Sequence, residues 1–300
     1  MYAVIDIGSN TLRMLLGDVR DNTILPHQYE REITRLAGNF SVQIGLGEAA
    51  LERTLTALES FKKIISEHDV DQVRVVATAA LRSANNRQVF LDRALTATNL
   101  KIEVIGGEEE ALLTTLGVLS VIDPLPESVI LIDIGGGSTE LICVVNGKIL
   151  LQKSYPLGVV RLCEDCFSIG ERQQQIDTII LKFVESLKLH DLFDREYQLI
   201  GAAGTITTLA ALYLKLKKYN SALINNCELS VDWLEKLQAE LELISSSERE
   251  NLIGMEKGRG DLILPGLQVV LTLMKQFQFP TIRVSDSGLL EGVMLRLTGS

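Results

Sequence analysis

The sequence predicts an α/β protein with two lobes, because one short acidic loop occurs twice and each copy follows an apolar strand. The copies are DIGSNT at residues 6–11, after a strand expected at residues 2–5, and DIGGGST at residues 133–139, after a strand expected at residues 129–132. The chain has 300 residues, more than one domain of ordinary size, and its 46% hydrophobic content can fill two cores. These observations indicate a duplicated architecture.

The first half is expected to open with a strand, the acidic loop, a second strand, a hairpin turn and a third strand. Apolar residues at 12–19 form the second strand, Asp21-Asn22 form the turn, and the return strand lies around residues 24–25. The spacing of apolar residues then predicts, in order, a helix at 50–65, a strand at 73–77, a helix at 89–97 and a strand at 102–105.

The second half repeats this opening, with the hairpin signal Asn146-Gly147 between apolar runs at 141–145 and 149–151. Further strands are expected at 198–202 and 281–284, and helices near 172–189, 208–216, 231–244 and 262–276. We expect one lobe at residues 1–119 and the other at 120–285, linked through a helix starting at 108–110 and a turn at 123–126. A C-terminal helix within residues 286–300 is expected to pack back on the first lobe.

Charge and composition exclude several classes of function. The net charge of −10, without a basic cluster, argues against nucleic-acid binding. The uncharged stretch at 197–214 is interrupted by glycines and threonines, so we expect a buried strand and helix and no membrane association. The chain opens directly on a strand and has four cysteines, which favours a reducing cytoplasm. Cys163 and Cys166 form a lone C-x-x-C, for which metal or redox chemistry is the less favoured interpretation.

The two acidic loops have the chemistry of phosphate-binding turns. Glycines let backbone N–H groups approach an anion closely, and hydroxyl and amide side chains add further donors. The same polar residues could instead bond their own backbone, as turn residues often do. Because there are two copies at matched positions, we expect phosphate binding by Gly8, Ser9, Asn10, Thr11, Gly135, Gly136, Gly137, Ser138 and Thr139.

Duplicated phosphate loops on mixed sheets resemble the superfamily of actin, sugar kinases and chaperone ATPases. That resemblance implies two ribonuclease-H-like lobes with the substrate in an interdomain cleft. Finer motifs resemble the exopolyphosphatase / guanosine pentaphosphate phosphohydrolase family from residue 4 to residue 297, in its short two-domain form. The segments that carry the resemblance are DIGSNTLRML, ATAALRSANN, VIGGEEEA, DIGGGSTEL, YPLGVVRL, GAAGTITTLAAL, GRGDLILPGLQ and VSDSGLLEGVM. One departure is visible, since GAAGT has alanines where the family usually has more glycine.

The resemblance assigns roles to individual residues. It implies that Glu110, the last acidic residue of the run at 108–110, is the catalytic base, although acidic residues in a first helical turn often only complement the helix dipole. It also implies that Arg82 contacts phosphate. Gly204 and Thr205 could present N–H groups to phosphate before the helix at 208–216, or could simply allow tight packing.

Carboxylates beside the loops suggest a divalent cation. Mg²⁺ or Mn²⁺ prefers hard oxygen ligands and needs few from the protein. We expect Asp133 and Glu140 to bind the metal, with support from the resemblance, and Asp6 as a weaker ligand that could merely orient loop amides. Arg259 and Asp261 resemble the family's R-x-D segment, and an ion pair between them is an equal alternative.

We therefore expect an enzyme that hydrolyses terminal phosphoanhydride bonds. Its substrate would be inorganic polyphosphate, and guanosine pentaphosphate would be converted to the tetraphosphate. The sequence does not decide between these substrates. The alternatives are a nucleotide-dependent kinase of the same superfamily and a non-catalytic sensor of these guanosine nucleotides. The oligomeric state stays open, although the resemblance favours a homodimer.

Overall fold

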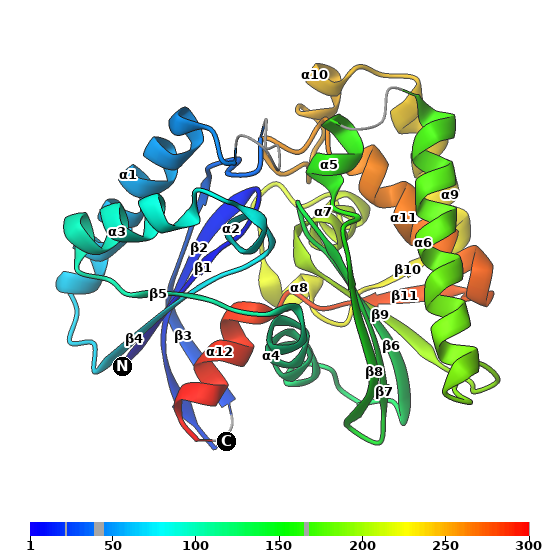
Figure 1. The fold of residues 1–300 in the computed structure, drawn as a ribbon. Coiled ribbons are helices and arrows are strands. Elements are labelled where there is room, and N and C mark those ends of the chain that lie inside the picture. The colour runs from blue at the N-terminus through cyan, green and yellow to red at the C-terminus, as the bar shows by residue number, and fades with distance from the viewer. Residues whose placement is uncertain (22, 39–44, 165–167, 300) are drawn as a thin grey trace. The chain divides into compact units, whose positions relative to one another are not determined.

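The computed structural model describes residues 1–21, 23–38, 45–164 and 168–299. The chain forms two compact units. The first comprises Met1–Ser120 and Gly288–Ser300, and the second comprises Val121–Ser287 (Figure 1). In the described part of the chain, no helix combines the length and the apolar character needed to cross a membrane.

A five-stranded mixed sheet of order β3-β2-β1-β4-β5 organises the first unit. The strands are β1 (Tyr2–Ile7), β2 (Thr11–Arg20), β3 (Thr23–Ile33), β4 (Gln72–Ala77) and β5 (Ile102–Val104). The first three strands pair antiparallel, whereas β4 and β5 run parallel to β1. The carboxyl ends of β1, β4 and β5 therefore lie at one edge of the sheet.

Helices cover both faces of this sheet (Figure 1). They are α1 (Glu48–Ser66), α2 (Ala79–Ser83), α3 (Arg87–Thr98), α4 (Gly107–Leu119) and α12 (Leu289–Leu297). Ala3, Ile5 and Ile7 of β1 are buried in a core with α1 and α3, while Val4 packs in a second core with α4 and α12. This alternation follows from the two-residue period of a strand.

Helices α4 and α12 touch backbone to backbone. A Cβ on Gly292 would lie 1.7 Å from the Leu113 carbonyl oxygen, and one on Gly117 would lie 1.9 Å from the Gly288 carbonyl oxygen. Only glycine fits at such a crossing, since even a methyl group would overlap the facing backbone. Helix α4, which carries the acidic run at its start, is therefore held tightly against α12.

The second unit repeats the first sheet. Its order is β10-β11-β9-β6-β7-β8, so strands β8-β7-β6-β9-β11 match β3-β2-β1-β4-β5 in order and direction, and β10 is an added antiparallel edge. The strands are β6 (Ser128–Ile134), β7 (Thr139–Val145), β8 (Lys148–Tyr155), β9 (Gln198–Ala202), β10 (Glu228–Ser230) and β11 (Thr281–Val284). The duplication expected from the loops is confirmed at the level of topology.

Seven helices among the described residues complete this unit (Figure 1). They are α5 (Val159–Glu164), α6 (Ile169–Leu189), α7 (Ala203–Tyr213), α8 (Ser221–Ile224), α9 (Val231–Glu242), α10 (Ser246–Arg249) and α11 (Ile263–Phe277). Ile130, Ile132 and Ile134 of β6 share one buried core with α6, α7 and α11. Capping boxes begin α6 at Ser168 and α10 at Ser245, where each serine accepts from the third helical N–H.

The sequence predicted most of the long elements well and the short ones poorly, although the return strand expected around residues 24–25 runs on to Ile33 as β3. The Asn146-Gly147 hairpin is confirmed, with φ of 51° and 71° at the two turn residues. The helix predicted at 208–216 was wrong at its start, because α7 begins at Ala203. Asn22 of the turn predicted at residues 21–22, and Cys166 of the C-x-x-C, lie outside the described residues. Short elements were missed because one or two turns carry no apolar period: α2, α5, α8, α10 and β10.

Candidate active site

The two acidic loops close the same turn. The N–H of Gly8 donates to the carbonyl of Thr11 at 3.0 Å, and the N–H of Gly135 donates to that of Ser138 at 2.9 Å. A Cβ on either glycine would crowd the same carbonyl oxygen, at 3.0 and 3.2 Å. The repeated sequence thus produces a repeated backbone geometry. Each loop follows the central strand of its own sheet, β1 or β6.

The side chains of the loops are largely buried, from 0 to 8% exposed at Ser9, Asn10, Thr11, Ser138 and Thr139. The Oδ1 atom of Asn10 is buried without a hydrogen-bond partner. The Thr139 hydroxyl already donates its proton to the Leu157 carbonyl. Because a hydroxyl has one proton, any hydrogen bond that Thr139 donates to phosphate must come from its backbone N–H.

Three predicted parts of the site in the first unit, one loop and two side chains, follow adjacent parallel strands. The loop at 8–11 follows β1, Arg82 lies in α2 after β4, and Glu110 lies in α4 after β5. The ends are tied together, since the N–H of Thr78 donates to Ile7 and that of Ile105 donates to Ala77. In open α/β sheets, ligands bind outside the carboxyl ends of the strands.

Arg82 and Glu110 form an ion pair at this edge. Nη1 of Arg82 lies 2.9 Å from Oε2 of Glu110 and also donates to the Ile105 carbonyl at 3.0 Å. The Glu110 side chain is only 10% exposed. Its neighbour Glu109 pairs instead with Arg74 at 3.0 Å and is 48% exposed. The structure therefore distinguishes the two glutamates, and Glu110 is the one directed to the strand ends.

The aspartate next to the last residue of each central strand faces a different partner in the two units. Asp6 lies opposite Arg13 in the sheet, and Nη2 of Arg13 contacts Oδ2 of Asp6 at 2.5 Å. Asp133 lies opposite Glu140, which also accepts from the Ser154 hydroxyl at 2.7 Å. The partner follows seven residues later in both copies (6 to 13 and 133 to 140). The copies therefore differ in charge at one equivalent position.

The Asp133 and Glu140 pair fits a divalent cation. Like charges directly opposite in a sheet are destabilising, and a bound cation would offset that repulsion with the carboxylate oxygens that Mg²⁺ prefers. In the first unit Arg13 already neutralises Asp6. The Oδ1 atom of Asp6 is nevertheless buried without a hydrogen-bond partner. In the described ranges, no group of three or more His, Cys, Asp or Glu side chains is arranged so that it could hold a metal ion.

The second loop rests on the segment at residues 157–162. The N–H groups of Val159 and Val160 donate to the carbonyls of Gly135 and Gly136, both at 3.0 Å. A Cβ on Gly158 would lie 2.1 Å from the Gly136 carbonyl oxygen, so only glycine fits against the loop. Sequence reasoning assigned no role to Gly158, and its part in the YPLGVVRL motif was the available signal.

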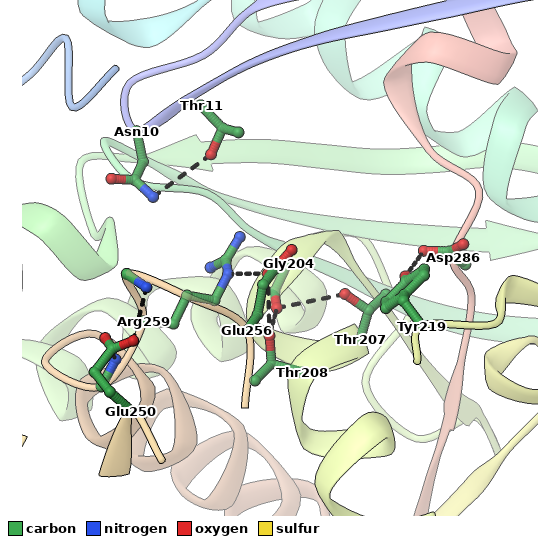
Figure 2. A network of polar contacts seen from close by, with 12 residues as sticks. Asn10, Thr11, Gly204, Thr207, Thr208, Tyr219, Glu250, Glu256, Arg259 and Asp286 are labelled. Carbon is green, nitrogen blue, oxygen red and sulfur yellow. Dashed lines mark hydrogen bonds and ion pairs between the residues drawn. The ribbon is translucent and has the colours of Figure 1, made fainter. Parts of the chain in front are cut away.

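A polar network surrounds the start of α7, where Gly204 and Thr205 lie in the first turn (Figure 2). A Cβ on Gly204 would lie 1.7 Å from Nη2 of Arg259, so the guanidinium rests against this turn. Nε of Arg259 donates to Glu256, which also accepts from Thr208 at 3.3 Å. Glu256 is thus an ion-pair partner of Arg259.

The Thr205 side chain is only 1% exposed and packs against α11. A Cβ on Gly266 would lie 2.3 Å from its Cγ2 atom. Backbone N–H groups, together with the Arg259 charge, are therefore what this turn can present to an anion.

Ala203, one of the alanines of GAAGT, has a strained backbone at this turn. Its φ is +66°, in the left-handed region, where glycine is favoured. Replacement of Ala203 by Gly should raise the free energy of unfolding by about 1 kcal/mol, because the Cβ clash is removed. Urea denaturation measures this.

The matched control is Ala202→Gly, since Ala202 has an ordinary φ of −129°. It should lose stability by about 0.5–1 kcal/mol through added freedom in the unfolded chain. Equal changes in the two variants would contradict strain at Ala203.

A thiol nucleophile is not favoured by the described cysteines. Burial raises the pKa of the Cys143 thiol and that of the Cys227 thiol, so both stay protonated at neutral pH. Cys143 and Cys227 are both free thiols. The arrangement of Glu110, Arg82 and the loop at one sheet edge instead suits activation of water beside a bound phosphate.

Curated relatives resemble this chain over nearly its whole length. Exopolyphosphatase 2 of Mycobacterium tuberculosis is 31% identical over 317 residues, which cover 99% of this chain and 98% of the relative. A bifunctional 3-dehydroquinate synthase/phosphatase of Fusobacterium nucleatum is 30% identical over 309 residues. That match covers 98% of this chain and 46% of the relative, so the chain spans about half the length of that protein.

Solved structures agree with the repeated sheets. The Aquifex aeolicus member of the Ppx/GppA protein family has a TM-score of 0.81 and 30% identity, with 99% of this chain and 97% of that chain covered. An exopolyphosphatase from Cytophaga hutchinsonii has a TM-score of 0.88 and 29% identity, with the same shares covered. The predicted actin-like α/β fold is confirmed by these likenesses. The model of the Ppx/GppA phosphatase family matches residues 18–300, and this chain belongs to that family.

Proposed function

We propose that this protein hydrolyses the terminal phosphoanhydride bond of inorganic polyphosphate, releasing orthophosphate, and converts guanosine pentaphosphate to the tetraphosphate. Membership of a phosphatase family supports the reaction class. The observation that carries the proposal is the ion pair of Glu110 with Arg82, which fixes a largely buried carboxylate at the strand ends where the phosphate loop also lies.

Glu110 would act as the general base. Its carboxylate would accept a proton from a water molecule aligned behind the terminal phosphorus, and the shortened phosphate chain would leave as an anion. Arg82 orients the carboxylate and can contribute positive charge as negative charge develops on the phosphoryl oxygens. The loop N–H groups would bind those oxygens, so the catalysis would come mainly from positioning and charge stabilisation.

Asp133 and Glu140 are the residues that would hold Mg²⁺ or Mn²⁺. Asp6, the weaker candidate ligand, already pairs with Arg13 in the first unit. When bound, the cation would polarise phosphoryl oxygens and offset their charge. The support is the carboxylate pair directly opposite in the β6 and β7 register. Gly204 and Thr205 would add backbone donors from the first turn of α7, next to the Arg259 guanidinium.

One assay tests the proposal against both alternatives. The protein is incubated with polyphosphate, or with guanosine pentaphosphate, in Mg²⁺ and without any acceptor, and orthophosphate is measured. A hydrolase releases phosphate under these conditions, a kinase requires an acceptor, and a sensor binds without turnover. Comparison of kcat/KM for the two substrates then decides which is preferred. Absence of phosphate release from both would overturn the proposed function.

A further inference from the structure

The loop that presents Arg259 is held by one carboxylate. Oε2 of Glu250 accepts from the Gly258 N–H at 2.9 Å, and Oε1 accepts from the Gly260 N–H at 2.7 Å. The two hydrogen bonds bracket Arg259 (Figure 2). Because both oxygens of one half-buried carboxylate are used, the backbone on each side of Arg259 is fixed relative to Glu250.

The glycines of this loop are required by its fit. Gly258 has a φ of +80°, in the left-handed region. A Cβ on Gly260 would lie 2.3 Å from the Ser246 carbonyl oxygen, so the loop lies directly on α10. Arg249 of α10 donates to the Gly260 carbonyl at 3.3 Å and also to the carbonyls of Leu241 and Ile244. The loop is therefore anchored through α10 to the end of α9.

The side chain that this loop presents is the buried Arg259, which is 8% exposed. Its guanidinium rests against Gly204 in the first turn of α7, whose N–H groups carry the positive end of the helix dipole. Its partner Glu256 is bonded to Thr208 of the same helix. The guanidinium is thus oriented from two sides, by Glu256 directly and by Glu250 through the backbone.

We infer that Glu250 is a positioning residue for substrate binding: through the Gly258 and Gly260 N–H groups it holds the Arg259 guanidinium at the start of α7, where a phosphate group binds. This rests on the proposed function, in which that turn binds substrate phosphate. Glu250 acts on affinity, because it touches neither the attacking water nor the base.

The charged, two-oxygen group is what the position requires. A glutamine keeps one acceptor oxygen but places an N–H₂ donor against a backbone N–H donor. Glu250→Gln should therefore free one side of the loop while leaving the side-chain volume unchanged. Loss of one charge-assisted hydrogen bond corresponds to about a tenfold weaker binding of phosphate.

The experiment is a double-mutant cycle of Glu250→Gln and Arg259→Ala in the full chain. KM and kcat are measured with tripolyphosphate, and its affinity is measured by calorimetry in Ca²⁺ without turnover. Glu250→Gln alone should raise KM and Kd about tenfold with kcat within about twofold. In the Arg259→Ala background the same substitution should change neither value further. A merely structural role would give additive effects.

Glu248→Gln is the matched control, since Glu248 caps the same short helix through hydrogen bonds with Ser245, away from the loop. It should keep the wild-type KM and Kd. Thermal unfolding identifies a variant that does not fold, in which case Glu250→Asp, too short to reach both N–H groups, replaces it in the cycle. Wild-type affinity in a folded Glu250 variant, or equal losses with and without Arg259, would overturn the inference. Tight binding of tripolyphosphate without its hydrolysis would instead contradict the proposed function and leave the inference about Glu250 standing.

Discussion

Replacement of Glu110 by Gln is expected to reduce kcat by about two to four powers of ten, the usual contribution of a positioned general base. That corresponds to roughly 3–5 kcal/mol of activation free energy. The amide has nearly the same shape and can still accept from Arg82, so the fold and the substrate affinity should change little. Only the ability to take a proton from water is lost. Steady-state kinetics on polyphosphate, with KM determined separately from kcat, measure the effect.

The control is the neighbouring residue in the same helical turn. Glu109→Gln removes an exposed carboxylate that pairs with Arg74, so its kcat should stay within about twofold of wild type. If Glu109→Gln causes the large loss and Glu110→Gln does not, the base has been assigned to the wrong glutamate. Similar small losses of kcat in both variants would mean that another group activates the water.

Asp133→Asn is expected to reduce activity by about two to three powers of ten, because one of two opposed carboxylates in the second unit is removed from the proposed cation site. Mg²⁺ or Mn²⁺ should raise the melting temperature of the wild-type protein, since a ligand that binds the folded state stabilises it. The variant should lose this shift. Thermal unfolding with and without Mn²⁺ measures it independently of turnover.

Asp177→Asn provides the control, because Asp177 is an exposed aspartate on α6 that accepts a hydrogen bond from Gln173. It should retain both the activity and the metal-dependent shift. Excess chelator should abolish phosphate release by the wild-type protein, and readdition of Mg²⁺ should restore it. Full turnover in chelator, or an unchanged melting shift in Asp133→Asn, would contradict the metal assignment.

The difference between the two loops shows how far the sequence alone can be taken. Arg13 and Glu140 follow Asp6 and Asp133 at the same spacing, so both the equivalence and the change of charge are present in the sequence. What the sequence lacks is the register. Only the antiparallel pairing places Arg13 opposite Asp6, and Glu140 opposite Asp133, on one side of each sheet. The strand register therefore decides which residues at a given spacing come into contact.

The sequence by itself determined the features that depend on neighbouring residues: the long strands and helices, the glycine turns of the loops and the Asn146-Gly147 hairpin. These follow from local periodicity and backbone freedom. The tertiary structure alone decided which distant residues meet. Glu110 meets Arg82 because β5 lies beside β4, Gly158 supports Gly136, and Glu250 holds the loop of Arg259. Such contacts depend on strand order and helix packing, which no local pattern of residues encodes.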